Sequence, residues 1–296
     1  MRLFLTGATG FIGSRLARRL VHDGRQLSIL VRAGSDTSIL GDAATDVAVH
    51  VYDGSLASIV AALDACRPDV VVHVASLFLA QHKPEDVERL VDSNIGMPAK
   101  LVEAMSCAGV KRFVNTGTSW QHYEDQPYSP VNLYSATKQA FEDLLAYWVE
   151  AKGLRAVTLK LFDTYGPGDP RPKLFNLLRR HAFSGDTLKM SPGEQLLDLV
   201  YVDDVTDAYV SVIEGFDALQ RDCYAVSNPQ RYTLRQLVDI YADIVRRPIR
   251  IEWGGQPYRP RETLIPWTTG FRPEGWLPKV TLQEGIRRME GIETAA

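Results

Sequence analysis

Tyr134 and Lys138 stand four residues apart in a stretch with helical spacing. That separation places both side chains on one face of a helix, one turn apart. A free phenol with a pKa of about 10 is a poor acid or base at neutral pH, but a neighbouring ammonium favours the phenolate and lowers the phenol pKa. We therefore expect Tyr134 to exchange a proton with a substrate and Lys138 to tune it.

Three glycines near the start of the chain form a second candidate site. They have the spacing GxxGxxG and lie between an expected strand, Arg2–Thr6, and an expected helix over residues 14–22. The first glycine permits a tight turn, the second lets backbone approach a ligand, and the third lets the helix pack on the strand. Free N–H groups and the helix dipole can then hold a pyrophosphate, which predicts dinucleotide binding. The expected contacts are Gly7, Gly10, Phe11, Ile12 and Gly13.

The residue that ends the second expected strand, Gln26–Arg32, faces the adenosine ribose of a dinucleotide. NAD enzymes place a carboxylate there, whereas this chain has Arg32, with Ser35 nearby. A guanidinium pairs with a 2′-phosphate bidentately, and a serine can donate to it. We therefore predict NADPH/NADP as the cofactor and favour NAD less. Lys138 can also hydrogen-bond the nicotinamide ribose. If Arg32 is merely solvated, the missing acid still argues against strict NAD use.

Strands and helices alternate along the chain, which is typical of βαβ units and a parallel sheet. The segment at residues 69–75 is almost continuously apolar, as expected of a strand buried on both faces. Further strands are expected at residues 46–52, 110–116, 154–162 and 222–227, and helices at residues 56–66, 85–108, 134–151, 173–184 and 234–246.

This alternation predicts an α/β fold, a doubly wound parallel sheet of the Rossmann type with a smaller, mostly helical C-terminal substrate domain. We expect the cofactor domain to comprise residues 1–165 and 198–230. Residues 166–197 and 231–296 are expected to form the substrate-binding domain.

The opening TGATGFIG, together with the Tyr134/Lys138 pair, resembles the extended short-chain dehydrogenase/reductases, a Rossmann-fold family that acts largely on nucleotide sugars. The resemblance covers nearly the whole chain. It implies a third catalytic group, Thr118, with Ser119 and Thr116 as alternatives. It also implies further cofactor contacts at Asp53, Gly54, Val74, Ala75 and Asn94, the last organising the active-site helix.

The same resemblance assigns residues to the substrate. Arg261, with Arg259 as second choice, matches the family's diphosphate-binding arginine, and Asn176 also stands where relatives contact the diphosphate. Trp120 is expected to contact the hexose. The other expected substrate contacts are Ser76, Gln195 and Thr118.

Two departures from the family narrow the chemistry. The residues after Thr118 are Ser119 and Trp120, whereas the sugar 4,6-dehydratases of the family have an Asp-Glu pair there. The cysteine–histidine pair of the family's epimerase-reductase branch is also missing, because Cys107 lies on the preceding helix. Dehydration is therefore not expected, and hydride transfer with one proton donor remains.

The resemblance implies NADPH-dependent reduction of the 4-keto group of a nucleotide-diphosphate 4-keto-6-deoxyhexose. One alternative is a nucleotide-sugar epimerase, which would use the same three residues but is disfavoured by Arg32. The other is an NADP-binding sensor without chemistry, which has no reason to keep Thr118, Tyr134 and Lys138 together.

Composition restricts the partners. The 296 residues carry a net charge of −3, so there is no basic excess for nucleic acid or an anionic membrane. No apolar run approaches the roughly 20 residues of a membrane span. The three cysteines lack metal-ligand spacing and are expected to be reduced thiols, which fits a cytoplasmic protein without a metal site. The resemblance also implies a homodimer formed through the helices at residues 86–108 and 134–151.

Overall fold

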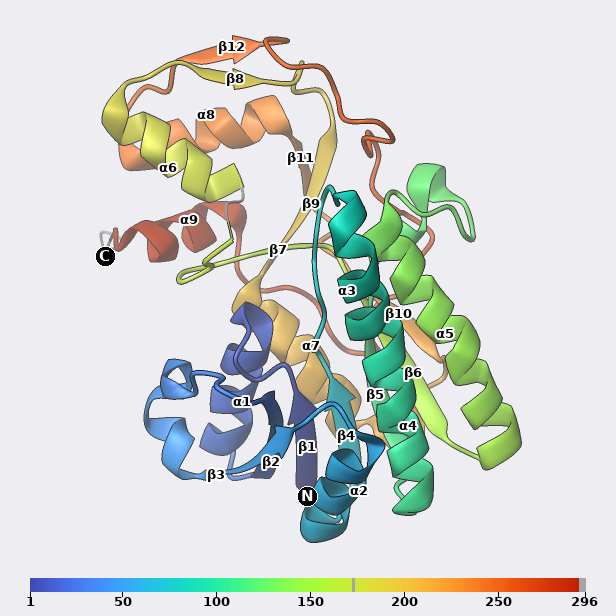
Figure 1. Cartoon of the computed structure of the whole chain (residues 1–296). Helices are drawn as coiled ribbons and strands as arrows, with labels where there is room; N and C mark the ends of the chain where they lie inside the picture. The colour runs from blue at the N-terminus through green and yellow to red at the C-terminus, as the bar shows by residue number, and fades with distance from the viewer. Residues whose placement is uncertain (172–173, 293–296) are drawn as a thin grey trace.

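The larger of two lobes is built on a parallel sheet, in a computed structural model that describes residues 1–171 and 174–292 (Figure 1). This sheet has seven strands, and every neighbouring pair is parallel. In spatial order the strands are β10 (Cys223–Val226), β6 (Arg155–Leu161), β5 (Arg112–Thr118), β4 (Val70–His73), β1 (Arg2–Thr6), β2 (Gln26–Arg32) and β3 (Val47–Tyr52).

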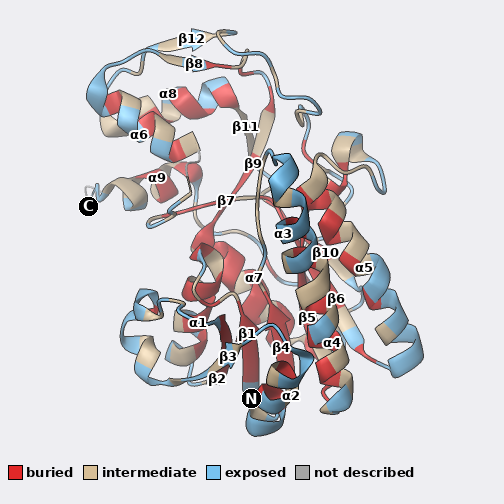
Figure 2. Ribbon diagram, viewed as in Figure 1, coloured by how far each residue is buried: buried red, intermediate tan, exposed pale blue. Residues whose placement is uncertain are grey.

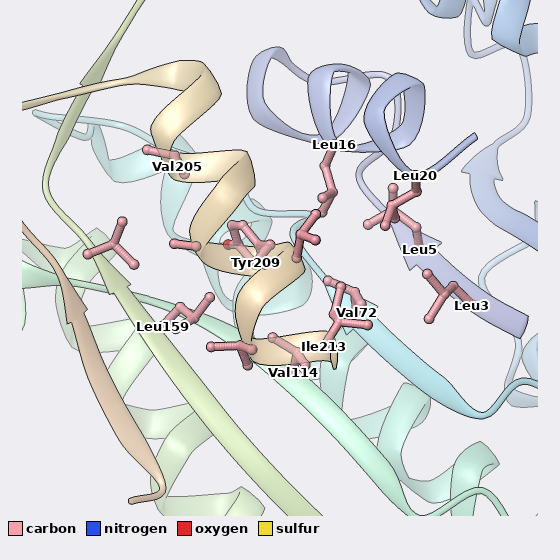
Figure 3. Close-up of a cluster of buried hydrophobic side chains, with 14 of the residues drawn as sticks. Leu3, Leu5, Leu16, Leu20, Val72, Val114, Leu159, Val205, Tyr209 and Ile213 are labelled. Carbon is pink, nitrogen blue, oxygen red and sulfur yellow. The ribbon is translucent and has the colours of Figure 1, made fainter. Parts of the chain in front are cut away.

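Helices cover both faces of this sheet. One face carries α1 (Phe11–His22) and α7 (Val202–Glu214), and the other carries α2 (Leu56–Cys66), α4 (Met97–Cys107) and α5 (Leu133–Lys152). Figure 3 shows Leu16 of α1 and Tyr209 of α7 packed over Val72 and Val114. The central strands are buried, whereas the edge strand β3 and the outer faces of α4 and α5 are largely exposed (Figure 2). The predicted doubly wound α/β fold is confirmed.

The strand order reverses between β1 and β4, because the chain continues from β1 outward to β2 and β3 and from β4 outward to β5 and β6. Thr6 at the end of β1 is paired in register with His73 at the end of β4, and their side chains lie 2.7 Å apart. In open α/β sheets this reversal is where ligands bind, outside the carboxyl ends of the strands. The glycine turn follows β1 at this point.

The smaller lobe has its own core and lies above the carboxyl ends of the large sheet (Figure 1). Its strands are β11 (Arg231–Thr233), β9 (Leu196–Tyr201) and β7 (Asp163–Tyr165) in one sheet, and β12 (Ile251–Trp253) and β8 (Leu188–Met190) in another. Its helices are α6 (Leu174–Ser184), α8 (Leu234–Val245) and α9 (Leu282–Glu290). Lys173, the first residue of the helix expected there, lies outside the described residues.

Two segments differ from the expected elements. The single helix expected at residues 85–108 consists of α3 (Val87–Val91), a π-helical segment, Asp92–Gly96, and α4. Residues 264–276, assigned by the sequence to the second domain, run back along the large lobe, where Ala225 N donates to Phe271 O at 2.7 Å. The division into two sequence-defined domains stays a prediction.

No helix within residues 1–171 and 174–292 is long and apolar enough to cross a membrane. The three cysteines are free thiols.

Candidate active site

Two glycines of the turn after β1 leave no room for a side chain. Gly7 has φ +78°, and a Cβ built on it would lie 2.5 Å from Ala75 N. A Cβ on Gly13 would lie 2.0 Å from Gly7 O. The turn therefore packs directly on α1 and on Val74 and Ala75, the residues after β4 that the resemblance assigned to the cofactor.

This turn leaves backbone donors unused. Gly10 N donates to Gly7 O at 2.9 Å, but among the described residues no backbone carbonyl accepts from the N–H groups of Phe11, Ile12 or Gly13. The first turn of α1 also lacks acidic side chains. Unpaired N–H groups at the positive end of a helix dipole suit a pyrophosphate. The Phe11 ring is buried, and the Arg171 guanidinium carbon lies 5.1 Å from its centroid.

The residues expected near the adenosine are exposed at the ends of β2 and β3. Arg32 ends β2, and Ser35 N donates to Arg32 O at 3.1 Å. Asp53 follows β3 and accepts from Ser55 N at 2.8 Å, and the hydrogen bonds from Ser55 hold the pKa of Asp53 at about 2. Gly54 has φ +97°, which only glycine adopts without strain. The structure thus places these residues at one edge of the sheet, with Asp53 ionised.

Tyr134 and Lys138 lie together in the first turns of α5, as predicted. Asn132 caps this helix by accepting from Ser135 N at 3.0 Å. Tyr134 is 9% exposed and Lys138 1%. Among the described residues, Lys138 Nζ has no hydrogen-bond partner. A buried ammonium without a partner is unfavourable, so this atom fits a ligand that supplies an acceptor.

The expected lowering of the Tyr134 pKa is wrong. Burial raises the pKa of Tyr134 to about 12, against smaller opposing effects of Ser76 and Arg171. Burial also lowers the pKa of Lys138 to about 8, opposed by the carboxylate of Glu142. Loss of hydration is therefore the dominant effect on the pKa of both side chains, and at Tyr134 it favours a protonated phenol.

Thr118 ends β5, and its backbone is fixed by the turn that follows. Its N–H donates to Gln121 Oε1 at 2.9 Å, and its Oγ1 accepts from Trp120 N at 3.3 Å. Thr116, an alternative to Thr118, instead donates from Oγ1 to His73 O at 2.7 Å and lies 2.6 Å from Tyr209 Oη. Thr116 thus serves to hold β5 to β4 and α7.

Asn94 connects the loop after β4 to the catalytic helix. Its Nδ2 donates to Thr137 Oγ1 and to Leu77 O, both at 3.0 Å. Its Oδ1 accepts from Ser76 Oγ at 3.1 Å and from Leu77 N at 2.8 Å. All these contacts are to protein, so Asn94 positions Ser76 and α5, the organising role that the resemblance implied.

An aromatic row extends from the catalytic tyrosine. The Phe78 ring lies 5.0 Å from that of Tyr134, edge to face, and 5.6 Å from that of Trp120. The Arg259 guanidinium carbon lies 5.9 Å from the Trp120 ring centroid. The sequence analysis missed Phe78, although its position in an apolar loop after β4 is a usable signal.

The cations expected to bind a diphosphate already have protein partners. Arg259 forms two hydrogen bonds with Glu262, at 2.8 and 2.9 Å. Arg261 donates to Pro130 O at 2.9 Å and to Ser129 Oγ at 2.7 Å. The segment that carries them therefore lies against the loop after Trp120.

Asn176 and Gln195 also bond within the smaller lobe. Asn176 Nδ2 donates to Arg171 O at 2.7 Å, and Gln195 Nε2 donates to Ser191 Oγ at 3.1 Å. Arg171, which the sequence analysis did not single out, pairs with Asp169 and is close enough to act on the Tyr134 pKa. A cation following the Tyr-Gly-Pro turn was the signal for it.

Two open cavities lie elsewhere. One of about 660 Å³ is lined by the start of β6 and residues 267–271, and one of about 700 Å³ lies around Arg2 and Arg112. Neither is lined by Tyr134 or Lys138. The candidate active site is therefore identified by the residue types at the reversal of strand order and not by either of these cavities.

The residues present fit a dinucleotide. The glycine turn and the unused N–H groups of α1 follow β1 at the reversal of strand order. Lys138 is close enough to His73, at the end of β4, to act on its pKa. No group of three or more His, Cys, Asp or Glu residues suited to a metal occurs in the part of the chain that the structure describes.

Comparison with known proteins agrees with this chemistry. Residues 3–226 match the model of the family described as "NAD dependent epimerase/dehydratase family". The chain is 28% identical over 269 residues to a CDP-abequose synthase of Yersinia pseudotuberculosis. This alignment covers 90% of this chain and 92% of that protein. It is 26% identical to a dTDP-6-deoxy-L-talose 4-dehydrogenase (NAD(P)(+)) of Kitasatospora kifunensis, covering 100% of this chain and 96% of that protein.

A solved structure supports the fold. It is the UDP-glucose 4-epimerase of Thermus thermophilus in complex with NAD, with a TM-score of 0.83 at 24% identity, covering 99% of this chain and 98% of that one. The family match extends over both candidate motifs, the glycine turn and the Tyr134/Lys138 pair. The chain is therefore an NAD(P)-dependent enzyme of the NAD dependent epimerase/dehydratase family, as its resemblance to the extended short-chain dehydrogenase/reductases implied.

Proposed function

We propose that this enzyme reduces the 4-keto group of a nucleotide-diphosphate 4-keto-6-deoxyhexose with NADPH. The observation that carries the proposal is the position of Tyr134, which is buried one helical turn from Lys138, whose ammonium has no hydrogen-bond partner among the described residues. The phenol is protonated at neutral pH, and the Lys138 ammonium can stabilise the phenolate that remains once Tyr134 has given its proton to an alkoxide. Addition of hydride to a ketone requires that donation.

Each catalytic side chain then has a distinct task. NADPH, when bound, supplies the hydride. Tyr134 Oη gives its proton to the carbonyl oxygen as negative charge develops there, so that ketone, hydride and proton make an alcohol. Lys138 Nζ donates to the ribose and stabilises the phenolate left on Tyr134. Thr118 Oγ1 orients the carbonyl.

The aromatic row supports a deoxysugar. Phe78 and Trp120 extend from Tyr134, and their ring faces offer no hydrogen bond to a hydroxyl at carbon 6. A methyl group at that carbon is therefore favoured over a hydroxymethyl group. Two similar proteins are named a CDP-abequose synthase and a dTDP-6-deoxy-L-talose 4-dehydrogenase (NAD(P)(+)). Both names support a nucleotide-linked sugar as substrate, and the second supports chemistry at carbon 4.

Arg32 supports NADPH over NAD as the cofactor. It is exposed at the end of β2, where a guanidinium can pair with a 2′-phosphate. Arg32→Ala is expected to weaken NADPH binding about tenfold and to leave NADH binding unchanged. Fluorescence titration with both cofactors measures this, and equal weakening of both would count against a phosphate contact.

A nucleotide-sugar epimerase is the second candidate. The similar Thermus thermophilus structure is named an epimerase and holds NAD. An epimerase must retain its nicotinamide between the two hydride transfers, whereas a reductase releases it. Cofactor fluorescence of the purified protein therefore separates the two. Retained nicotinamide favours the epimerase.

The proposed quaternary state is a homodimer formed through α4 and α5 in the cytoplasm. On α5, the exposed Leu144 and Tyr147 side chains are 43% and 54% accessible, and apolar residues of this kind suit a contact with a second copy. Sedimentation tests it, and a monomer at micromolar concentration would contradict it.

The deciding experiment is NADPH oxidation with a panel of CDP-, dTDP- and GDP-4-keto-6-deoxyhexoses. We expect turnover with at least one member, which would also identify the nucleotide. No oxidation of NADPH by any member would overturn the reductase. In that case NADPH that binds without turnover would favour a non-catalytic sensor.

A further inference from the structure

A buried polar network lies behind the end of β5, outside the residues assigned above. Glu142 Oε2 on α5 lies 3.3 Å from Lys160 Nζ on β6, and Lys160 Nζ lies 2.8 Å from His122 Nε2. Lys160 and His122 are only 5% and 6% exposed. Because burying an ammonium is unfavourable, its presence here calls for a function beyond packing.

Hydrogen bonds join this network to Thr118. Gln121 Nε2 donates to Glu142 Oε1 at 3.0 Å, and Gln121 Oε1 accepts from Thr118 N at 2.9 Å. His122 Nδ1 donates to a loop carbonyl at 3.0 Å, so its Nε2 accepts from the Lys160 ammonium. The end of β5 is thereby connected through side chains to α5 and β6.

The strand itself leaves room for these contacts. Gly117 is paired in register with Lys160, and a Cβ on it would lie 2.8 Å from Glu142 Oε1 and 2.9 Å from Gln121 Oε1. From the other side, the Trp267 ring stacks on that of His122 at 4.0 Å. Any side chain at position 117 would displace the network.

The network also reaches the catalytic lysine. Glu142 lies one helical turn after Lys138 and favours its charged form. The titratable groups that face these residues from other strands are His73 on β4 and Cys223 on β10. Burial lowers the pKa of His73 and raises that of Cys223 to about 11, so both are uncharged at neutral pH. The charged groups in this region are therefore Lys138, Glu142 and Lys160, together with the carboxylates of Asp222 near Cys223 and Asp125 near His122.

On the basis of the proposed reductase, we propose that Lys160 is a positioning residue that fixes Thr118 through Glu142 and Gln121 and shares the Glu142 carboxylate with Lys138. The Lys160 ammonium, 3.3 Å from Glu142 Oε2, draws on the carboxylate that stands one helical turn after Lys138. It thus narrows the pH range over which Lys138 stays charged and holds the ribose.

Two substitutions should shift the pH dependence in opposite directions. Lys160→Met removes the competing cation, so the alkaline limb of the kcat profile should move to higher pH by about 0.5 unit or more. Glu142→Gln removes the carboxylate, so the limb should move to lower pH. Lys160→Arg keeps the charge and should keep the wild-type midpoint. Glu150→Gln, at an exposed position of α5, is the matched control.

The same variants are titrated with NADPH by fluorescence across the pH range, because Lys138 is expected to bind the ribose. This readout needs no sugar, so it tests the network even if no 4-keto sugar is reduced and the reductase proposal fails. Opposite shifts for Lys160→Met and Glu142→Gln support the proposal. If the pH midpoints of both variants shift in the same direction, the proposal is overturned. It is also overturned if the variants lose activity while their pH midpoints stay unchanged. If Lys160→Met does not fold, the Glu142→Gln midpoint decides: a lower value supports the proposal and an unchanged value overturns it.

Discussion

The two sides of the candidate active site are built differently. The cofactor side comprises residues 7–13 and Lys138. Several donors there have no acceptor within the part of the chain that the structure describes, including the Lys138 ammonium and the N–H groups that begin α1. On the substrate side, which comprises Trp120, Asn176 and residues 259–262, the charged and amide groups already bond to protein. Arg259, for example, is paired with Glu262.

This difference indicates which side of the candidate active site is preorganised for its ligand. Unpartnered buried donors are costly in the free protein, so they indicate a ligand that is bound in one geometry. Paired cations must exchange a protein partner for the substrate, so their contribution to affinity is smaller and more dependent on geometry. We therefore expect large effects from changes on the cofactor side and moderate ones from changes on the substrate side.

The largest expected effect is loss of the proton donor. Tyr134→Phe should lower kcat by ~10²–10⁴-fold and leave NADPH affinity unchanged, because the hydroxyl acts only on the reacting carbonyl. Steady-state NADPH oxidation and fluorescence titration measure the two quantities. Tyr147→Phe, an exposed tyrosine on the same helix, is the control. Retention of more than half the activity by Tyr134→Phe would remove this residue from the mechanism.

Next in size is closure of the glycine turn. Gly13→Ala should destabilise the protein by ~1–3 kcal/mol and abolish measurable NADPH binding, since the added Cβ would lie 2.0 Å from Gly7 O. Gly96→Ala is the matched control, because its nearest atom is 3.9 Å away. Urea unfolding and fluorescence titration follow both. Unchanged binding by the Gly13 variant would mean that the cofactor side is not closely packed.

Lys138→Met should separate stability from function. It removes a buried cation, so we expect the free energy of unfolding to rise by ~1–2 kcal/mol at neutral pH while turnover is lost. Burial lowers the Lys138 pKa from 10.5 to about 8, so the unfolded chain binds more protons between these values. The free energy of unfolding of the wild type therefore rises with pH across that window. The difference in this free energy between wild type and Lys138→Met should narrow as the pH rises.

Urea unfolding at about pH 7 and about pH 10 checks the sign of this linkage. If Lys138→Met is less stable than wild type at neutral pH, the Lys138 ammonium already has a stabilising protein partner. The proposed difference between the cofactor side and the substrate side would then be wrong.

The smallest expected effects are on the substrate side. Arg259→Ala should raise KM about tenfold, whereas Glu262→Gln, which weakens the hold on Arg259, should lower KM about twofold. Arg89→Ala, in an exposed ion pair with Asp86, is the control. An increase in KM for Glu262→Gln would instead show that Glu262 positions Arg259 for the substrate.

Much of the fold was predictable because its signals are local. The apolar run that became β4 and the glycine spacing before α1 depend on burial and sterics within a few residues. The Tyr134/Lys138 pair was predictable for the same reason, since four-residue spacing on a helix fixes the shared face. The family resemblance also predicted a catalytic role for Thr118. The side chain of the nearby Thr116 is instead hydrogen-bonded to His73 and Tyr209.

Other features needed contacts between distant segments. Phe78 reaches Tyr134 across 56 positions of the sequence, and the partners of Arg261 lie in the loop after Trp120. The direction of the Tyr134 pKa shift was mispredicted for a related reason. Spacing reports that an ammonium is near, but only the packed structure reports how completely water is excluded.

The sequence by itself determined the alternation of strands and helices, the glycine turn and the pairing of Tyr134 with Lys138, because periodicity and short-range sterics act within a few residues. Only the tertiary structure decided which polar groups of the described residues remain unpartnered, which arginines are already paired and which residues contact Glu142. These properties depend on desolvation and on hydrogen-bond geometry between segments far apart in the chain, and neither is encoded by local spacing.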